Sequence, residues 1–196
     1  MRLFVAIVPP DGVLVELAKA VEPLRSANPE LRWTGPEDWH LTLAFLGEVA
    51  EDVLPELMIR TERAAQRHPA QQIAVRGAGA FPKAARARVV WAGISTTSGL
   101  GPLAASVAAG ARRAGAPPPD EGRRYRAHLT LARCRRQAAD VSGVTATLAG
   151  FEGTPWTAAD IRLIRSNLHG SPRYAELGRW PLRQPGAQAR QSRSST

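Results

Sequence analysis

Apolar and polar positions along the chain follow spacings that predict a mixed succession of strands and helices. Residues 3–8, LFVAIV, form an apolar run that stops at a Pro-Pro-Asp-Gly turn, which favours a buried strand. Residues 11–27 have apolar side chains at helical spacing and predict a helix with Asp11 as its N-cap. The same reading predicts helices at 51–67, 99–114 and 138–148, and strands at 71–81, 87–95, 156–167 and 173–180.

One five-residue word, His-Leu-Thr-Leu-Ala, occurs twice, at 40–44 and at 128–132. In each half of the chain, a strand and a helix precede the word, and a helix and further strands follow it. Strands and helices are therefore mixed in both halves, which predicts an α+β fold made from a duplicated unit rather than two independent domains.

The two words place polar side chains on otherwise apolar strands. Because side chains alternate between the faces of a strand, His40 and Thr42 share one face, and His128 and Thr130 share one face. A polar group buried without a partner costs roughly 1–3 kcal/mol. Burying the same pair twice therefore favours one shared site that both strands line.

Two histidines and two small hydroxyls suit chemistry at phosphorus. Near neutral pH one imidazole can act as a base while another acts as an acid. Threonine hydroxyls can donate hydrogen bonds to phosphate oxygens. In-line displacement needs a nucleophile and a leaving group on opposite sides of phosphorus, which two related half-sites would provide.

A metal site is the competing interpretation. Cys134 is the only cysteine, which excludes an intramolecular disulfide and a cysteine-cluster metal site. Neither word contains an acidic residue, and the chain has no His-Glu-x-x-His motif to supply a third zinc ligand. We therefore expect acid–base catalysis without a metal or other cofactor.

Composition and charge bear on the partner and the compartment. The chain has 196 residues, 44% hydrophobic and 22% charged, and a formal net charge of +9. This charge indicates either a polyanionic partner such as nucleic acid or an arginine-rich solvated surface. The N-terminal apolar run is too short for a signal peptide or a membrane span, so we expect a cytoplasmic protein without membrane contact. Residues 183–196 contain three arginines and no acid, and predict a disordered basic tail.

The pair of His-x-Thr-x words resembles the motifs of the 2H phosphoesterase superfamily. The stretches RLFVAIVPP, RWTGPEDWHLTLAFLGEV, RVVWAGI, YRAHLTLAR and IRLIRSNLHGSPRYAEL are similar, in this order, to the RNA 2′,3′-cyclic phosphodiesterases, also called 2′-5′ RNA ligases. The resemblance covers residues 2–182. It departs at Ala127, where family members commonly have proline, and this change could loosen the entry to the following strand.

The resemblance implies a single bilobal domain over residues 1–182 with pseudo-twofold symmetry. Two antiparallel-rich sheets would flank a central cleft, with helices on the outside. The implied reaction opens a 2′,3′-cyclic phosphate on RNA or a nucleotide to a 2′-phosphomonoester without metal or ATP. Carried over by position, His40 donates the proton to the 3′-oxygen and His128 activates water, while Thr42 and Thr130 hold the phosphate oxygens.

Further residues are candidates for substrate binding. Arg133 matches an arginine of the family, but strict alternation turns it away from His128. By the same rule Ala44 lies on the face of His40, and Phe45 lies on the opposite face. Tyr125 and Arg126 are expected to stack on and pair with the nucleotide. Core packing is expected for the tryptophans, Trp33, Trp39, Trp91, Trp156 and Trp180.

Two alternatives remain open. The same residues could join RNA ends through a 2′-5′ bond, with a 5′-hydroxyl in place of water. A non-catalytic RNA-binding module is the other alternative, although two intact His-Thr pairs argue against it. The physiological substrate could be tRNA halves, oligonucleotides, cyclic nucleotides or ADP-ribose cyclic phosphate. A pseudo-symmetric monomer would already complete the site.

Overall fold

The structure, a computed structural model, describes residues 1–96, 99–119, 124–167 and 172–184. Its helices are α1 (Asp11–Ala27), α2 (Leu54–Arg67), α3 (Leu100–Arg113) and α4 (Ser142–Thr147), with 3-10 turns η1 (Pro36–Asp38) and η2 (Glu51–Val53). Its strands are β1 (Arg2–Ile7), β2 (Leu31–Trp33), β3 (Leu41–Glu48), β4 (Gln71–Lys83), β5 (Arg86–Thr96), β6 (His128–Cys134), β7 (Trp156–Ala158), β8 (Asp160–Ser166) and β9 (Tyr174–Pro181).

The strands form one continuous sheet in the order β7-β4-β5-β6-β3-β1-β8-β9, with β2 also paired to β6. A single antiparallel pair, Leu41 with Leu129, joins β3 to β6. It divides the sheet into a β6 half (β7, β4, β5, β6 and β2) and a β3 half (β3, β1, β8 and β9). Farther along β6, residues 132–134 pair with β2 instead, so the two halves diverge from the Leu41–Leu129 pair. These halves are the two sheets of the predicted fold.

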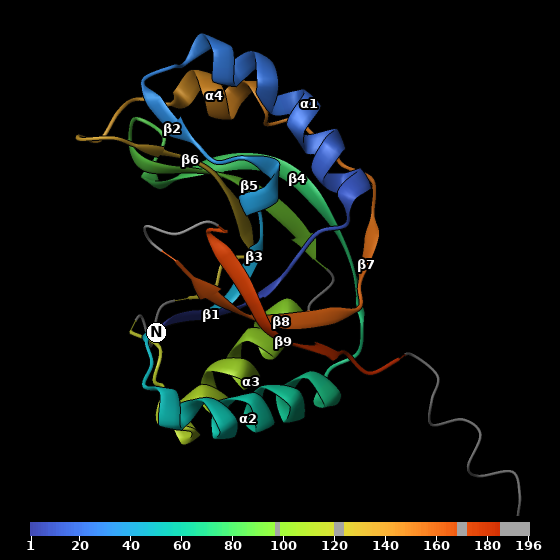
Figure 1. The fold of residues 1–196 in the computed structure, drawn as a ribbon. Helices are drawn as coiled ribbons and strands as arrows, with labels where there is room; N and C mark the ends of the chain where they lie inside the picture. Colours follow the sequence, from blue (N-terminus) through green and yellow to red (C-terminus); the bar gives the residue numbers. More distant parts are fainter. Residues whose placement is uncertain (97–98, 120–123, 168–171, 185–196) are drawn as a thin grey trace, which may run out of the picture.

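The helices cover the outer surfaces of the two halves (Figure 1). α1 and α4 lie over the β6 half, and α2 and α3 pack together against the β3 half. α1 buries Val13, Leu17, Val21 and Leu24, which form one helical stripe. Gly110 permits the close approach of α3 to α2, because a Cβ there would lie 3.3 Å from the Arg60 carbonyl oxygen. The predicted α+β class with external helices is confirmed.

The predicted elements agree with the structure in kind, with three differences. Asp11 is the first helical residue rather than the N-cap, which is Pro10, and no side chain caps α1. The strand predicted at 156–167 is divided between β7, which pairs with β4, and β8, which pairs with β1. β2 was not predicted, because a three-residue strand is too short to show a periodicity.

Each word-bearing strand contains a β-bulge at the same position of the word. In β3, Thr42 pairs with Ala6 and Ala44 pairs with Val5, so Leu43 is the extra residue. In β6, Thr130 pairs with Trp91 and Ala132 with Val90, so Leu131 is the extra residue. Because a bulge adds one residue to the strand, the side chains beyond it lie on the opposite faces from those that strict alternation predicts. Both alanines are consequently in the main core, and the residue after each alanine returns to the face of the histidine.

Phe45 shows the effect of the first bulge. It packs with Phe4, Ala6 and Tyr174 in a small cluster on the second face of β1, away from the main core. The expectation that Ala44 shares the face of His40 and that Phe45 opposes it was therefore wrong, since the bulge at Leu43 shifts the alternation.

Thr34 ties the β6 bulge to the segment that leads into β3. Its N–H donates to the Leu131 carbonyl at 2.9 Å. Its hydroxyl oxygen lies 2.8 Å from the Thr130 carbonyl oxygen and 2.9 Å from that of Leu131. The Trp39 Nε1–H donates to the same hydroxyl at 2.9 Å. Trp39 is 1% exposed, so the residue just before His40 is fixed in the core as predicted.

The C-terminal end of the described chain is held by the protein. Leu182 is buried, and the Arg183 N–H donates to the His68 carbonyl at 2.8 Å. Of the tail predicted at 183–196, residues 185–196 lie outside the described residues. Among the described helices, none is long and apolar enough to cross a membrane.

Replacing Thr34 with valine should destabilise the fold. Thr34→Val removes the hydroxyl, which is both a donor to the bulge carbonyls and the acceptor of the Trp39 indole N–H, while the backbone N–H still bonds Leu131. Leaving a buried polar group such as this N–H unpaired costs about 1–3 kcal/mol. We expect the free energy of unfolding in urea to fall by this amount. Thr157→Val, at an exposed position with one side-chain hydrogen bond, is the control. An unchanged urea midpoint for Thr34→Val would contradict this account of the bulge.

Candidate active site

The single pair between β3 and β6 brings the two words together. Leu41 and Leu129 point into the core, so the residues on either side of them point to the other face. In the antiparallel register about this pair, each histidine lies across from the threonine of the other word, His40 across from Thr130 and His128 across from Thr42. The structure thus brings the four residues predicted from the words to one face. Neither threonine hydroxyl has a hydrogen-bond partner within the described part of the chain.

The two histidine rings are held in matching ways. His40 Nδ1 lies 2.8 Å from the carbonyl oxygen of Asp38, and His128 Nδ1 lies 2.7 Å from that of Arg126. A carbonyl oxygen only accepts hydrogen bonds, so Nδ1 carries the proton on both rings. In the neutral form each Nε2 is then an unprotonated acceptor, and in the cationic form it is a donor. Both rings therefore present the same catalytic atom.

Aromatic side chains surround both rings. The ring of Phe4 stacks on His40 at 4.5 Å between centroids, and Tyr174 meets His40 edge-on at 5.1 Å. His128 contacts Phe81 edge-on at 5.1 Å and the tilted ring of Trp91 at 6.2 Å. These contacts fix the plane of each imidazole and remove water from its faces.

Burial and nearby positive charge favour neutral imidazoles. Burial lowers the pKa of His40 to about 4, against the opposing effect of its hydrogen bond to Asp38, and the charges of Arg173 and Arg133 add to the lowering. Burial also lowers the pKa of His128, by a smaller amount, and Arg133 contributes there too. In the free protein at neutral pH both rings are therefore uncharged.

Arg133 lies on the site face because of the β6 bulge. Its charge acts on both histidines, whereas strict alternation would turn it away. The expected orientation away from His128 was therefore wrong, for the same reason as at Phe45. Burial and the neighbouring arginines, Arg32 foremost, lower the pKa of Arg133.

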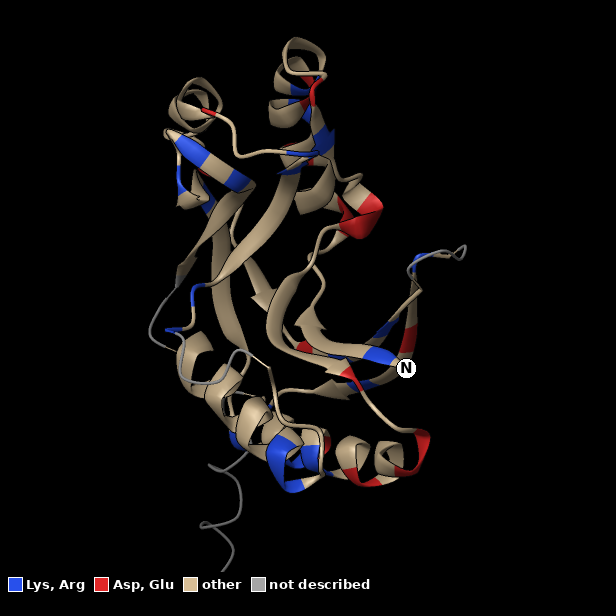
Figure 2. Cartoon of the chain, turned by 90° about the vertical axis from the view of Figure 1, so that its left-hand side faces the viewer, with Lys and Arg blue, Asp and Glu red and all other residues tan. Residues whose placement is uncertain are grey.

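Four arginines from different segments form a group beside the site, which we call the arginine group. Arg32 pairs directly with Arg133 across β2 and β6, and the charges of Arg2 and Arg173 also act on Arg133. The Arg2 guanidinium lies over the Phe45 ring at 4.7 Å from its centroid. Basic segments occur in both halves of the molecule (Figure 2). The site is thus suited to an anionic ligand.

One member of the arginine group also supports His40. Arg173 Nη1 donates to Asp38 Oδ2 at 2.9 Å, and the Asp38 side chain is only 15% exposed. Asp38 is the residue whose carbonyl accepts from the His40 ring. Arg173, the residue just before β9, therefore fixes the turn that orients His40.

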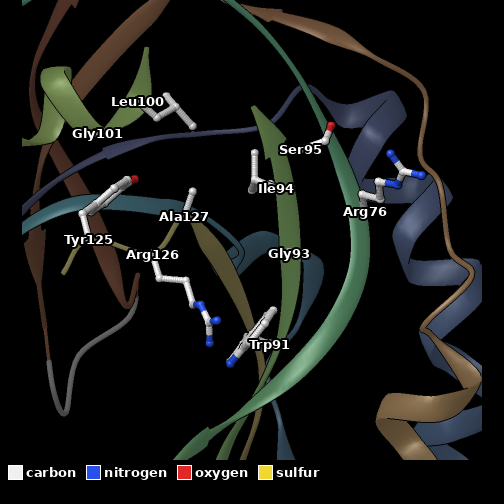
Figure 3. A pocket seen from close by; sticks show the side chains of 10 residues that line it. All are labelled: Arg76, Trp91, Gly93, Ile94, Ser95, Leu100, Gly101, Tyr125, Arg126 and Ala127. Carbon is white, nitrogen blue, oxygen red and sulfur yellow. The ribbon is translucent and has the colours of Figure 1, made fainter. Parts of the chain in front are cut away.

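A pocket of about 390 Å³ (Figure 3) lies beside His128, whose ring contacts Trp91 of the pocket wall. Tyr125 and Arg126 line it, together with Trp91. The Arg126 guanidinium lies over the Trp91 ring at 5.2 Å from its centroid. Trp91 is thus part of the pocket wall, and its predicted place in the core was wrong. The sequence did contain a signal for this position. Trp91 lies between Val90 and Ala92, which are buried, so alternation along the strand places its side chain on the opposite face.

Several residues of the site were not predicted from the sequence: Phe4, Phe81, Tyr174, Arg173, Arg2 and Arg32. Five of them belong to strands, and Arg173 directly precedes β9; all six meet the words only through the sheet topology, so no local pattern marks them. Among the described residues, no group of three or more His, Cys, Asp or Glu side chains is placed to hold a metal ion.

Comparisons with known proteins agree with this geometry. Residues 7–91 match the model of the family described as LigT like Phosphoesterase. An RNA 2′,3′-cyclic phosphodiesterase of Thermus thermophilus is 33% identical over 191 residues, covering 93% of this chain and 91% of that protein. A crystal structure of a Thermus thermophilus protein has a TM-score of 0.75 and 30% identity, covering 94% of this chain and 100% of that chain. Escherichia coli LigT complexed with 3′-AMP has a TM-score of 0.70 and 27% identity, covering 92% and 97%. By sequence and by fold, this chain belongs to the LigT-like phosphoesterase family, as the resemblance of its two words indicates.

Proposed function

We propose that this phosphoesterase hydrolyses 2′,3′-cyclic phosphate ends of RNA or nucleotides to 2′-phosphomonoesters, by histidine acid–base catalysis without a metal ion. The observation that carries the proposal is the matched pair of imidazoles, each tied through Nδ1 to a backbone carbonyl. Two supports come from relatives. The Thermus relative is named for this activity, and LigT has been crystallised with 3′-AMP.

The reaction is an in-line displacement at phosphorus. His128 Nε2 accepts a proton from water while the water oxygen forms a bond to phosphorus. The bond from phosphorus to the 3′-oxygen breaks on the opposite side, and His40 Nε2–H gives its proton to that oxygen. The products are a 2′-phosphate and a 3′-hydroxyl. Thr42 and Thr130, whose hydroxyls are unengaged within the described part of the protein, donate to the non-bridging oxygens.

The proton on His40 depends on the substrate. With a pKa of about 4, His40 is neutral in the free protein at pH 7. A phosphate anion beside Nε2 favours the charged imidazole and raises its pKa. Binding of the substrate thus favours the protonated His40 that cleavage requires. Arg133 contributes to binding the negatively charged phosphate.

The central test is activity of histidine variants in the presence of EDTA. Because each histidine moves a proton in the transition state, His40→Ala and His128→Ala should each reduce kcat by about 10²–10⁴-fold. The assay is hydrolysis of a 2′,3′-cyclic nucleotide or a cyclic-phosphate-ended oligonucleotide, with a check for the 2′-phosphate product. His68→Ala, which removes a histidine bonded to Ser106 at the α2–α3 contact, is the control.

Near-normal rates in both site variants would reject histidine catalysis, and loss of the wild-type rate in EDTA would reject metal independence. Salt-sensitive RNA binding with no turnover at all would favour the non-catalytic binding module instead.

Anion binding should be linked to protonation of His40. Sulfate keeps a constant charge between pH 7 and 5, so any pH dependence of its affinity reports on the protein. We expect the His40 pKa, followed by NMR of the imidazole protons, to rise when sulfate is added. The affinity should increase as the pH falls, by at most tenfold per pH unit for one bound proton.

His40→Gln should weaken this pH dependence and leave only the contribution of His128. A His40 pKa that stays the same with saturating sulfate would contradict the proposed substrate-dependent protonation.

A further inference from the structure

Arg173 belongs to the arginine group, but its side chain is engaged differently from that of Arg133. Its Nη1 donates to Asp38 Oδ2 at 2.9 Å, and its guanidinium lies over the Tyr174 ring at 5.4 Å from the centroid. Arg133 has no ion pair among the described residues. Arg133 can therefore turn its donors to a phosphate, whereas Arg173 is already bonded within the protein.

The partner of Arg173 lies in the turn just ahead of His40. Asp38 is the last residue of η1, and its N–H donates to the Gly35 carbonyl at 3.0 Å, while the Trp39 N–H donates to the Pro36 carbonyl at 3.1 Å. The Asp38 carbonyl accepts the Nδ1–H of His40 at 2.8 Å. The direction of this carbonyl depends on two anchors, the buried Trp39 ring on one side and the Asp38 carboxylate on the other.

The segment that carries Arg173 is itself fixed. It leads into β9, the terminal strand of the β3 half (Figure 1). The Asn167 N–H donates to the Arg173 carbonyl at 2.8 Å, and the Asn167 side-chain amide donates to the Pro172 carbonyl at 2.9 Å. Tyr174, the next residue, meets the His40 ring edge-on at 5.1 Å. Two consecutive residues thus act on His40, one on its ring and one on the turn whose carbonyl holds that ring.

The other histidine has no equivalent support. The His128 ring is held by the carbonyl of Arg126, an exposed residue that forms no ion pair among the described residues. This difference suits the two proposed roles. An acid must direct its proton at an oxygen that the bound substrate holds in place, so a small rotation of the ring costs rate. The base takes a proton from water, which can adjust its own position.

We infer that Arg173 and Asp38 form a positioning pair for the acid step. Their ion pair fixes the Asp38 carbonyl, and this carbonyl holds the His40 ring with Nε2 directed at the leaving 3′-oxygen. The inference rests on the proposed function, in which His40 is the acid. Arg173 acts through His40 and does not bind the substrate phosphate. Loss of the pair lets the imidazole rotate and exchange its Nδ1–H tautomer for the Nε2–H tautomer.

Neutral variants of similar size test the inference. Arg173→Gln and Asp38→Asn each break the ion pair and keep the Asp38 carbonyl. The Arg173 side chain is 45% exposed, and an ion pair of this kind adds little to stability, so both variants should fold. Each should lower kcat for a 2′,3′-cyclic nucleotide about 10- to 100-fold, the cost of a small displacement of a catalytic group, with KM close to the wild-type value.

Three further variants separate positioning from other roles. The double variant should lose no more activity than either single variant, because both remove the same interaction. Arg173→Lys, which can keep one contact with Asp38, should recover most of the rate. Arg179→Gln is the matched control and should behave as wild type, because it breaks an ion pair with Glu176 on the same strand that involves neither histidine.

The His40→Ala background shows whether Arg173 acts through His40. In that background Arg173→Gln should have no further effect on the residual rate, whereas the loss of a phosphate ligand would lower it again.

A measurement without substrate tests the pair independently of catalysis. Nitrogen chemical shifts of the imidazoles distinguish the two neutral tautomers. Wild type should show the Nδ1–H form of His40, and both single variants should show a mixture of the two forms. His128 should keep its Nδ1–H form in every variant.

Several outcomes would overturn the inference. A raised KM with unchanged kcat in Arg173→Gln would assign Arg173 to phosphate binding. Unchanged kinetics, additive losses in the double variant, or an unaltered His40 tautomer in both single variants would each contradict positioning. Wild type that does not hydrolyse cyclic phosphates would refute the proposed function instead, and the tautomer measurement would still decide whether the pair holds the ring.

Discussion

The geometry of the site depends on one antiparallel contact, the pairing of Leu41 with Leu129. Both leucines are fully buried, so this is also where the main core passes from one half of the sheet to the other. On the opposite face, the residues flanking the pair are the two histidines and the two threonines. Because β3 and β6 diverge directly afterwards, the same contact that aligns the polar residues also leaves room for a ligand above them.

The paired bulges complete this arrangement. Leu43 and Leu131 are the extra residues of the two bulges. Because of each bulge, the side chain two residues later points to the site face. In β3 that residue is Phe45, which provides an aromatic surface under Arg2. In β6 it is Arg133, which provides charge. Both strands therefore contain the same bulge, and the two half-sites differ because the bulge places Phe45 on the site face in one strand and Arg133 in the other.

The sequence was sufficient to predict the four central residues, because alternation holds from His40 to Thr42 and from His128 to Thr130. It failed beyond them, since a bulge formed by one leucine among other apolar residues leaves no mark in the hydrophobic pattern. Phe4 and Phe81 could not be predicted, because their contacts with the histidines depend on which strands become neighbours. Trp91 was assigned to the core from its size and strand position, although its alternation with buried neighbours indicated the other face.

The two half-sites also differ in a way that suits their proposed roles. Two arginines lower the pKa of each histidine, but His40 is buried more deeply against the stacked Phe4 ring, and this burial lowers its pKa to about 4, further than that of His128. An imidazolium of lower pKa is the stronger acid toward an alkoxide leaving group, and the imidazole of higher pKa is the stronger base toward the nucleophile. The pocket adjoins His128 and not His40, because Trp91 and Arg126 of its wall contact the His128 ring and hold its Nδ1. The duplicated frame thus aligns two equivalent imidazoles, and unequal surroundings favour one as the acid and the other as the base.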